Sequence, residues 1–424
     1  MTYEEKIEKL FNRFPSYQTV GGRAYKPGLE SMQAFDSLLG HPWRRFRSIH
    51  IAGTNGKGSV SSFLAAALSG SGRRIGLYTS PHLTDFRERI KIVSKDGFEM
   101  IPCKAVEAFL DKYEGFMESD NPSFFEITTS MAFDWFAAEG VDLAVIECGL
   151  GGRLDSTNIL TPLLSIITNI GLEHTFYLGN TLEEIAFEKA GIIKSGVPAV
   201  IGEINDATRP VFESVASERG CEIVFAPERK CQLQADGLDL PGEYQQQNLT
   251  TVAAALDILH REYGITADIT RLAHAAALTG LHGRWEKLAE KPDIICDIGH
   301  NAHGLKHVFD QLRQVAPQYR HVFIIFGVVS DKDIEAIAPL MIKPDGHISY
   351  ILTQPSTQRA MPVRRLAGKL KRYGICGATA STVARAISRA KKEAAAEDLI
   401  FIGGSNFTVS DAVATIAPNP GWSV

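Results

Sequence analysis

The 424-residue chain contains no apolar run as long as the ~18 residues that a helix needs to cross a bilayer, so a membrane-spanning protein is not expected. Its first six residues include two glutamates and do not show the basic and apolar pattern of a signal peptide. Cysteine is scarce, with six residues and no C-x-x-C pair, which argues against a disulfide framework and against a zinc site. These absences predict a cytoplasmic protein with no membrane partner.

An excess of positive charge is absent as well. The chain has 49 acidic and 44 basic residues and a formal net charge of −5, so it offers no basic field to attract a nucleic-acid backbone. Hydrophobic residues make up 45% and charged residues 22%, as in ordinary folded proteins, and we find no internal repeat or low-complexity segment. Nucleic acid is therefore not an expected partner.

The pattern of apolar segments predicts an α/β fold. Buried strands are predicted at 49–52, 75–78, 143–147, 164–168, 199–202, 294–297, 321–326, 348–353 and 399–403. Amphipathic segments of helical length lie between them, for example at 128–139, 182–190, 305–315 and 381–395, and this alternation is typical of a parallel sheet covered by helices on both faces. The length requires more than one core, and the polar stretch 288–292 suggests domains at 1–288 and 289–424.

The most informative motif is Gly53-Thr54-Asn55-Gly56-Lys57-Gly58-Ser59, which joins an apolar strand at 48–52 to a helix-like run at 60–68. Glycines let backbone N–H groups approach an anion closely, and the N-terminus of the following helix adds partial positive charge. The ammonium group of Lys57 supplies a mobile charge for the terminal phosphates. A loop that only linked strand to helix would not need a lysine between two glycines, so the motif predicts a nucleotide phosphate site.

The spacing separates this loop from better-known nucleotide sites. The standard phosphate loop is G-x-x-x-x-G-K-[ST], whereas here Ile51 stands at the first glycine position and Gly58 follows Lys57 directly. Ordinary GTPases and kinases therefore fit poorly. The glycines at 149, 151 and 152 do not have the G-x-G-x-x-G spacing of a dinucleotide loop, so a NAD site is not expected.

Polar residues follow the next predicted strands, where open α/β sheets bind their ligands. Ser80 and His82 follow the strand at 75–78, and Glu147 ends the strand at 143–147. A carboxylate at the end of an apolar strand loses hydration unless it meets a cation, so Glu147 is a candidate ligand for a nucleotide-bound Mg²⁺. Ser80 precedes a proline and is explained equally well as the start of a turn.

His174 and Lys189 are further candidates with a plain structural alternative. His174 follows the strand at 164–168, and together with Glu147 and Ser80 it can complete the ligand shell of a hard cation, although a lone histidine is more often structural. Lys189 lies at the end of the predicted helix 182–190, where a cation also stabilises the helix dipole.

Taken together, the motifs resemble the folate branch of the Mur ligase superfamily, the dihydrofolate synthases and folylpolyglutamate synthases. The resemblance covers nearly the whole chain. It is carried by FPSY at 14–17, KPGL at 26–29, GTNGKGS at 53–59, TSPH at 79–82, Glu147 with GLGGRLD at 149–155, TNIG at 168–171, EKAGIIK at 188–194, Gly283-Arg284, Asp297 with His300-Asn301, and Asp331-Lys332-Asp333. Glu173 stands where the family usually has aspartate, His282 replaces a proline, and DIGHNA at 297–302 replaces DGAHNP.

The resemblance implies a phosphate-loop domain with a largely parallel sheet, followed by a smaller Rossmann-like α/β domain of the glutamate-ligase type. It also implies that Lys57 contacts the ATP phosphates, that Mg²⁺ is held by Ser80, Glu147 and His174, and that Lys189 becomes carbamylated to support a second Mg²⁺. The nucleotide contacts implied in the same way are Asn248, Arg284, Asp297 and His300, with Arg284 on phosphate and Asp297 on the sugar. The predicted catalytic residues are then Lys57, His174, Lys189 and Arg284.

The implied reaction is ATP-dependent amide synthesis, in which a carboxylate of dihydropteroate or a folate becomes an acyl phosphate and the amino group of L-glutamate displaces the phosphate. The expected partners are small molecules, namely ATP, Mg²⁺, L-glutamate and the pterin acceptor, and a monomer is expected. One alternative is a Mur-type ligase for a nucleotide sugar, which would want a further domain where only 52 residues precede Gly53. Another is a nucleotide-switched binding protein without ligase activity.

Overall fold

The computed structural model describes residues 1–14, 16, 21, 26, 28–229, 233–234 and 237–416. The FPSY and KPGL motifs fall partly outside these residues, because Pro15, Tyr17 and Pro27 are not among them. In the part of the chain that is described, no helix is long and apolar enough to cross a membrane.

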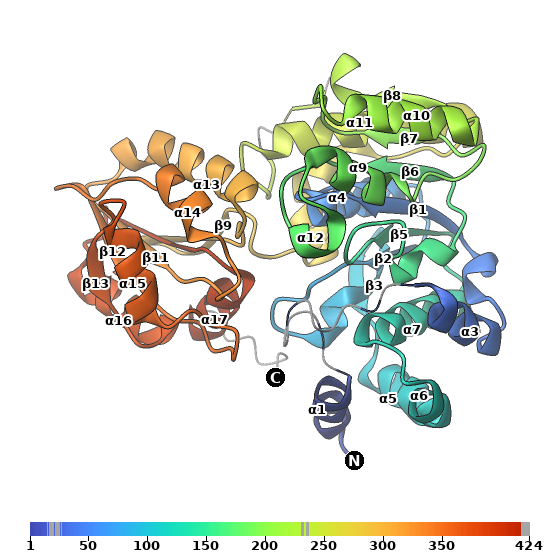
Figure 1. Ribbon diagram of the computed structural model, residues 1–424, viewed down its shortest axis with the longest axis horizontal. Helices are drawn as coiled ribbons and strands as arrows, with labels where there is room; N and C mark the ends of the chain where they lie inside the picture. Colours follow the sequence, from blue (N-terminus) through green and yellow to red (C-terminus); the bar gives the residue numbers. More distant parts are fainter. Residues whose placement is uncertain are drawn as a thin grey trace. The chain divides into compact units, whose positions relative to one another are not determined.

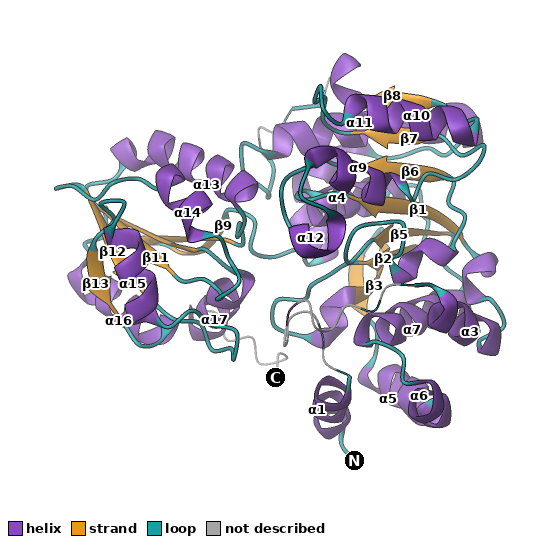
Figure 2. Ribbon diagram, in the orientation of Figure 1, coloured by secondary structure: helices purple, strands orange, loops and turns teal. Residues whose placement is uncertain are grey.

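The chain forms two compact units, drawn in Figures 1 and 2. The first contains Met1–His82, Phe86–Asp239 and Tyr244–Leu281, and the second contains Leu83–Asp85, Leu240–Glu243 and His282–Val424. The boundary expected after residue 288 falls inside strand β9 (Glu286–Ala289), which pairs with β10 (Asp293–Asp297) in the sheet of the second unit. The division therefore lies earlier in the chain, after Leu281.

The first unit is built on an eight-stranded sheet in the order β4-β3-β2-β5-β1-β6-β7-β8. The strands are β1 (Arg47–Ala52), β2 (Ile75–Tyr78), β3 (Ile90–Ser94), β4 (Gly97–Met100), β5 (Leu143–Glu147), β6 (Leu164–Ile167), β7 (Ala199–Ile201) and β8 (Ile223–Phe225). All neighbours are parallel except β3 and β4, which form an antiparallel edge next to β2. The sequence did not predict β3, β4 or β8, whereas the predicted strands of this unit are present.

Helices cover both faces of this sheet (Figure 1). The helices are α1 (Tyr3–Arg13), α3 (Glu30–Leu38), α4 (Lys57–Ser69), α5 (Cys103–Lys112), α6 (Glu114–Asp120), α7 (Phe124–Ala138), α8 (Thr175–Leu178), α9 (Leu182–Ala190), α10 (Arg209–Arg219), α11 (Gln245–Tyr263) and α12 (Ala275–Thr279). Apolar side chains of α7, α9 and α10 pack on one face, and α4 and α11 pack on the other. A 3-10 helix (Ile269–His274) directly precedes the short α12.

Local sequence explains where several helices begin. Ser123 and Glu126 form a reciprocal capping box at the start of α7, and Thr181 and Glu184 do the same at the start of α9. Helix α4 differs, because its N-cap is Gly56 in a left-handed conformation and makes no side-chain cap. The start of α4 therefore has no side-chain acceptor for its first backbone N–H groups.

The second unit contains a six-stranded sheet in the order β13-β12-β11-β14-β10-β9, in which only β9 is antiparallel to its neighbour. Its other strands are β11 (Val322–Phe326), β12 (Ile348–Leu352), β13 (Gly377–Thr379) and β14 (Leu399–Gly403), and its helices are α13 (Ala302–Val315), α14 (Ile334–Ile337), α15 (Val363–Lys371), α16 (Val383–Glu393) and α17 (Asn406–Ile416). Alternate residues of β10 enter different cores, with Ile295 among α13 to α15 and Ile294 with α16 and α17. The predicted fold class, two α/β sheets covered on both faces, is confirmed.

Candidate functional site

Four loops of the first unit leave the sheet along the same edge. Strands β1, β2, β5 and β6 are parallel neighbours, so the loops after Ala52, Tyr78, Glu147 and Ile167 all start at the carboxyl ends of the strands. This is the edge where open α/β sheets bind ligands. The predicted phosphate and metal residues of the first half of the chain lie on these loops, at the end of β5 or at the start of α4, except Lys189, which lies on α9.

The loop between β1 and α4 requires glycine at two positions. Gly53 has a φ angle of 149° and Gly56 a φ angle of 82°. A Cβ atom at Gly53 would lie 1.9 Å from Oγ1 of Thr168, and one at Gly56 would lie 2.4 Å from Oδ1 of Asn248. The backbone therefore passes closer to both neighbours than a side chain allows, and the uncapped start of α4 follows directly.

The loop is held in shape by the residues after β6. The backbone N–H of Thr54 donates to the carbonyl of Asn169 (3.0 Å), and the N–H of Asn55 donates to Oδ1 of Asn169 (2.8 Å). The N–H of Gly171 donates to Oγ1 of Thr54 (2.9 Å), and the hydroxyl of Thr168 donates to the carbonyl of Asn55 (2.6 Å). In this structure Thr54 and Asn55 thus shape the loop, while the cationic groups come from Lys57 and the helix start.

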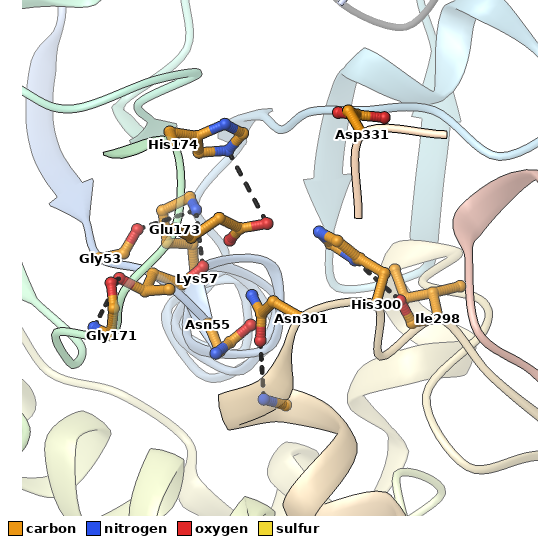
Figure 3. Close-up of polar contacts among 12 residues, drawn as sticks. Gly53, Asn55, Lys57, Gly171, Glu173, His174, Ile298, His300, Asn301 and Asp331 are labelled. Atoms are coloured by element: carbon orange, nitrogen blue, oxygen red, sulfur yellow. Dashed lines mark hydrogen bonds and ion pairs between the residues drawn. The ribbon is translucent and has the colours of Figure 1, made fainter. Parts of the chain in front are cut away.

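Two lysines meet at one carbonyl of this loop. The Nζ of Lys57 lies 3.0 Å from the carbonyl oxygen of Gly53 and 3.3 Å from that of Thr54. The Nζ of Lys189, whose side chain comes from the last turn of α9, donates to the same Gly53 carbonyl at 2.8 Å. Figure 3 shows Lys57 beside Gly53. The sequence motifs at 53–59 and 188–194 are therefore brought together, and they concentrate positive charge.

Burial gives Lys189 unusual acid–base properties. Its side chain is buried, with 4% of its surface exposed. Desolvation, followed by the nearby charge of Lys57, lowers the pKa of Lys189 from 10.5 to about 7, against an opposing effect of Glu173. Near neutral pH, Lys189 is therefore a neutral amine in a large fraction of the molecules, unlike an ordinary lysine at a helix end.

These groups surround a pocket of about 290 Å³ in the first unit. Its walls come from the loops after β1, β5 and β6, from the start of α4 and from the last turn of α9. The lining residues are Gly53, Thr54, Lys57, Cys148, Gly149, Leu150, Gly151, Glu173, His174 and Lys189. The pocket combines a glycine-rich backbone with two lysines, a histidine and a carboxylate, as a site for a polyanion with a cation would require.

Glu173 and His174 enter the pocket from the loop after β6. The Nε2 of His174 lies 3.9 Å from Oε1 of Glu173, the contact marked by a dashed line in Figure 3. His174 adopts a φ angle of 55° as the N-cap of α8, so its backbone is left-handed at the mouth of the pocket. Glu173, which sequence reasoning treated only as a departure from the family pattern, is therefore part of the site.

Ser80 and Glu147 are brought together in a second part of the edge. The backbone N–H of Ser80 donates to Oε2 of Glu147 at 3.2 Å, and Glu147 is buried with 3% of its surface exposed. Among the described residues, no three His, Cys, Asp or Glu side chains gather as a metal centre. Carboxylate and hydroxyl groups are hard oxygen ligands, and Mg²⁺ commonly completes its shell with phosphate and water, so the side-chain types of this pair fit that ion.

Asn248 lies on α11 and braces the start of α4. Its Nδ2 donates to Oε1 of Gln245 at 2.7 Å, and Nε2 of Gln245 donates to Oγ of Ser59 at 3.2 Å. All three residues are buried. The structure thus links Asn248 to both Gly56 and Ser59, and it adds Gln245, which sequence reasoning did not identify.

Asp297 belongs to the second unit, where it ends β10. Its Oδ2 accepts the backbone N–H of Trp285 at 2.9 Å, and its Oδ1 accepts that of Gly299 at 2.7 Å. Trp285 has a φ angle of 50°, so this carboxylate holds a left-handed turn in place. The visible role of Asp297 in this structure is to fix the backbone before β9 and after β10.

Arg284 and His300 lie on the two segments that Asp297 holds. The Nη1 of Arg284 donates to the carbonyl of His282 at 3.2 Å, and Nδ1 of His300 lies 3.0 Å from the carbonyl oxygen of Ile298, a contact drawn in Figure 3. Arg284 and His300 are therefore positioned by the carboxylate of Asp297, through the backbone, and by local backbone contacts.

Comparison with known proteins identifies the family. A Mur ligase middle domain matches residues 51–253, and a Mur ligase, glutamate ligase domain matches residues 283–406. The dihydrofolate synthase/folylpolyglutamate synthase of Bacillus subtilis (strain 168) is 36% identical over 342 residues, which cover 72% of this chain and 76% of that protein. The chain belongs to the folate branch of the Mur ligase superfamily.

Solved structures of folate-branch ligases share the fold along the whole chain. The structure of E. coli FolC in complex with DHPP and ADP has a TM-score of 0.83 and 26% identity, and covers 99% of this chain and 98% of FolC. The bifunctional folylpolyglutamate synthase/dihydrofolate synthase from Yersinia pestis, complexed with AMPPNP and Mn ion, has a TM-score of 0.79 and 26% identity, with 98% of each chain covered. The family resemblance expected from the motifs is confirmed.

The sequence analysis assigned no binding or catalytic role to several residues that the structure places at this site. They are Thr168 and Asn169, which bind the phosphate loop, Cys148 and Leu150, which line the pocket, and Gln245, which braces α4. Thr168 and Asn169 directly follow a predicted strand, so their position was a usable indication. Gln245 lies three residues before Asn248 but in none of the sequence motifs, and only the packing of α11 against α4 reveals it.

Proposed function

We propose that this protein is an ATP-dependent ligase that adds L-glutamate to dihydropteroate, to the γ-carboxylate of a folate, or to both, and releases ADP and phosphate. The observation that carries the proposal is the glycine loop at 53–56, where an uncapped helix start and the ammonium groups of Lys57 and Lys189 border one pocket. The proposal is supported by the relative named as a dihydrofolate synthase/folylpolyglutamate synthase. It is also supported by the similar solved structures, one with DHPP and ADP and one with AMPPNP and Mn ion.

The loop fits a nucleoside triphosphate. Its close approach to Thr168 and Asn248 leaves no room for a Cβ at Gly53 or Gly56, and Gly53 and Thr54 line the pocket. The start of α4 and the ammonium of Lys57 then attract the terminal phosphates. Gly58 and Ser59 form the first turn of α4 and complete this cradle.

The proposed metal site uses the residues of the adjoining loops. Ser80 brings a hydroxyl, and Glu147, which accepts the Ser80 backbone N–H, brings a buried carboxylate; His174 lines the pocket together with Lys189. Mg²⁺ bound there would offset the negative charge that gathers on the transferring phosphoryl group. Lys189, buried and held by the Gly53 carbonyl, has the neutral amine that carbamylation requires, so its conversion into a carboxylate-bearing ligand remains part of the proposal.

The chemistry starts from an unreactive acid. A carboxylate repels an attacking amine and has no good leaving group, so it must first take the γ-phosphoryl group and become an acyl phosphate. The protein contributes position and charge to this step, with Lys57 on the phosphate oxygens. The α-amino group of L-glutamate then attacks the acyl carbon, an amide bond forms, and phosphate leaves with the bonding electrons.

Other expectations stay predictions. Arg284, Asp297 and His300 are proposed to contact the nucleotide, and the structure adds that Asp297 fixes the backbone on which the other two lie. A cytoplasmic location, a monomeric state and the absence of a nucleic-acid partner are likewise proposed.

Purified protein with ATP, Mg²⁺ and labelled L-glutamate tests the proposal against three acceptors: dihydropteroate, tetrahydrofolate and a muramyl nucleotide. We expect label in the pterin products, with one ADP released per glutamate added. Incorporation only with the muramyl nucleotide would overturn the folate assignment. ADP release that does not depend on glutamate or acceptor would instead favour the nucleotide-switched binding protein.

A further inference from the structure

One wall of the pocket is the loop after β5, and a single carboxylate holds it. Oδ2 of Asp155 accepts the backbone N–H of Gly149 at 2.9 Å and that of Leu150 at 2.8 Å. Both of these residues line the pocket, whereas Asp155 itself does not and is buried with 3% of its surface exposed. One oxygen of a residue outside the pocket therefore holds two consecutive peptide groups of the pocket wall.

The other oxygen of this carboxylate is anchored in the core. Oδ1 of Asp155 accepts the backbone N–H of Thr157 at 3.1 Å and also its hydroxyl hydrogen. Since the Thr157 hydroxyl donates to Asp155, its oxygen accepts from Nε2 of His50 at 2.8 Å. His50 is fully buried in β1, and burial lowers its pKa to about 3, so the ring is neutral; the hydroxyl of Thr157, already donated to Asp155, then requires the hydrogen of the ring to be on Nε2. The chain of hydrogen bonds thus runs from the central strand to the pocket wall.

Close packing restricts the position of the loop after β5. A Cβ atom at Gly149 would lie 2.6 Å from the ring of Phe125, and one at Gly152 would lie 2.8 Å from the carbonyl oxygen of Lys189. The N–H of Arg153 donates to the carbonyl of Glu188 at 2.7 Å. Because the loop is packed against the last turn of α9, a shift of the wall also shifts the backbone that carries Lys189.

We propose that Asp155 is a positioning residue for the ligase reaction: it holds the peptide groups of Gly149 and Leu150, and through this loop it sets the place of Lys189 in the pocket. The inference deepens the proposed function and rests on it for its kinetic consequences. Asp155 touches no reacting atom; it acts through the loop that it binds. No part of the sequence pattern other than the GLGGRLD motif marks this residue.

The test compares Asp155→Ala with Asp155→Asn. The alanine variant leaves the Gly149 and Leu150 N–H groups without their acceptor, and we expect kcat/KM for ATP to fall by about 100-fold, the scale of a misplaced catalytic group. The asparagine variant keeps one oxygen that can accept both N–H groups, so it should recover most of this loss. Rescue by asparagine distinguishes a hydrogen-bond acceptor from a need for the charge.

A matched control is Asp345→Ala. Oδ1 of Asp345 also accepts two backbone N–H groups, from His347 at 2.7 Å and Ile348 at 2.8 Å, but it lies in the second unit before β12. This variant loses the same kind of contact without touching the pocket wall. We expect it to keep the kcat/KM of the wild-type protein.

Hydrogen–deuterium exchange gives a readout that needs no turnover. In Asp155→Ala the amides of Gly149 and Leu150 should exchange at least about 10-fold faster than in the wild-type protein, with the core strands unchanged. If wild-type protein added no glutamate, the proposed function would fail while this measurement still tested Asp155. Unchanged exchange at Gly149 and Leu150, or equal kinetic losses in Asp155→Ala and Asp345→Ala, would overturn the inference.

Discussion

At the scale of single residues, the site is defined by charges that meet in a small space. Lys57 and Lys189 come from helices far apart in sequence and share the carbonyl of Gly53. Two ammonium groups this close repel one another, which is part of the reason why the pKa of Lys189 falls to about 7. A polyanion removes this repulsion, so the arrangement favours the nucleotide-bound state.

Replacing Lys57 by alanine tests the phosphate role. Its amine bonds to backbone carbonyls of its own loop, so the fold should persist without it. We expect kcat to fall by about 100-fold or more, because a preplaced positive charge on the transferring phosphate is lost. Lys9→Ala, which removes an exposed ion pair with Glu114, serves as the control and should leave turnover unchanged. Near-normal turnover in Lys57→Ala would contradict the assignment.

Replacing Glu147 by glutamine tests the metal role. The amide oxygen can still accept the N–H of Ser80, but the negative charge is gone. The Mg²⁺ concentration for half-maximal activity should rise about 10-fold or more, since affinity for hard cations depends on ligand charge. Glu126→Gln removes another buried carboxylate that accepts a backbone N–H, in the capping box of α7, and should not change the Mg²⁺ requirement. A similar Mg²⁺ dependence in both variants would refute the role of Glu147.

At the scale of elements, the turn from β1 into α4 depends on glycine for two separate reasons. Gly56 and Gly72 both have φ angles of 82°, but a Cβ at Gly56 would meet Asn248 at 2.4 Å, whereas one at Gly72 would meet nothing within 4 Å. Alanine at either position costs about 1–2 kcal/mol of stability from the left-handed backbone. We expect only Gly56→Ala to raise the KM for ATP as well. Equal KM values in the two variants would show that the close approach to Asn248 does not matter.

A buried lysine joins β3 to α12 and makes stability depend on pH. Lys91 donates to the carbonyls of Thr279 (2.7 Å) and Gly280 (3.0 Å), and burial lowers its pKa from 10.5 to about 8. Between these two pH values the unfolded chain holds a proton that the folded chain has released. This group therefore makes the folded state more stable as pH rises from about 8 toward 10.5.

Lys91→Met removes this titration. The free energy of unfolding of the wild-type protein, relative to the variant, should increase with pH above about 8, by about 3 kcal/mol at most if the whole shift is realised. Denaturant unfolding of both proteins at a series of pH values measures the difference. A difference that stays constant over this range would show that Lys91 has an ordinary pKa in the folded state.

At the scale of the whole molecule, the chain has two units with separate sheets and separate cores. We therefore expect calorimetric unfolding in two components, which a single two-state transition does not describe. The ATP analogue AMPPNP with Mg²⁺ should stabilise the first unit, by about 2.7 kcal/mol at 100 times its Kd. The shift should vanish in Lys57→Ala. A shift confined to the other component would place the main phosphate contacts outside the 53–59 loop.

Much of the fold could be predicted because strands buried on both faces are continuous apolar runs. The central strands β1, β5, β6, β11 and β14 have this character and were all predicted. Strands at or next to the sheet edges were not predicted: β3, beside the edge strand β4, contains the buried Lys91, β4 is partly exposed, and the edge strand β9 is short and polar. Their pairing depends on neighbours, so local sequence carries little information about them.

The sequence alone predicted a phosphate site at the 53–59 loop, because a lysine between two glycines at a strand-to-helix turn has few other uses, and its motifs gave the resemblance that identified the family. Only the tertiary structure showed that Lys57 and Lys189 share one carbonyl, that Asn248 seats the loop through Gly56, and that Asp155 holds the wall from behind. These contacts join residues from separate elements, and long-range packing, which no local pattern encodes, decides which of them meet.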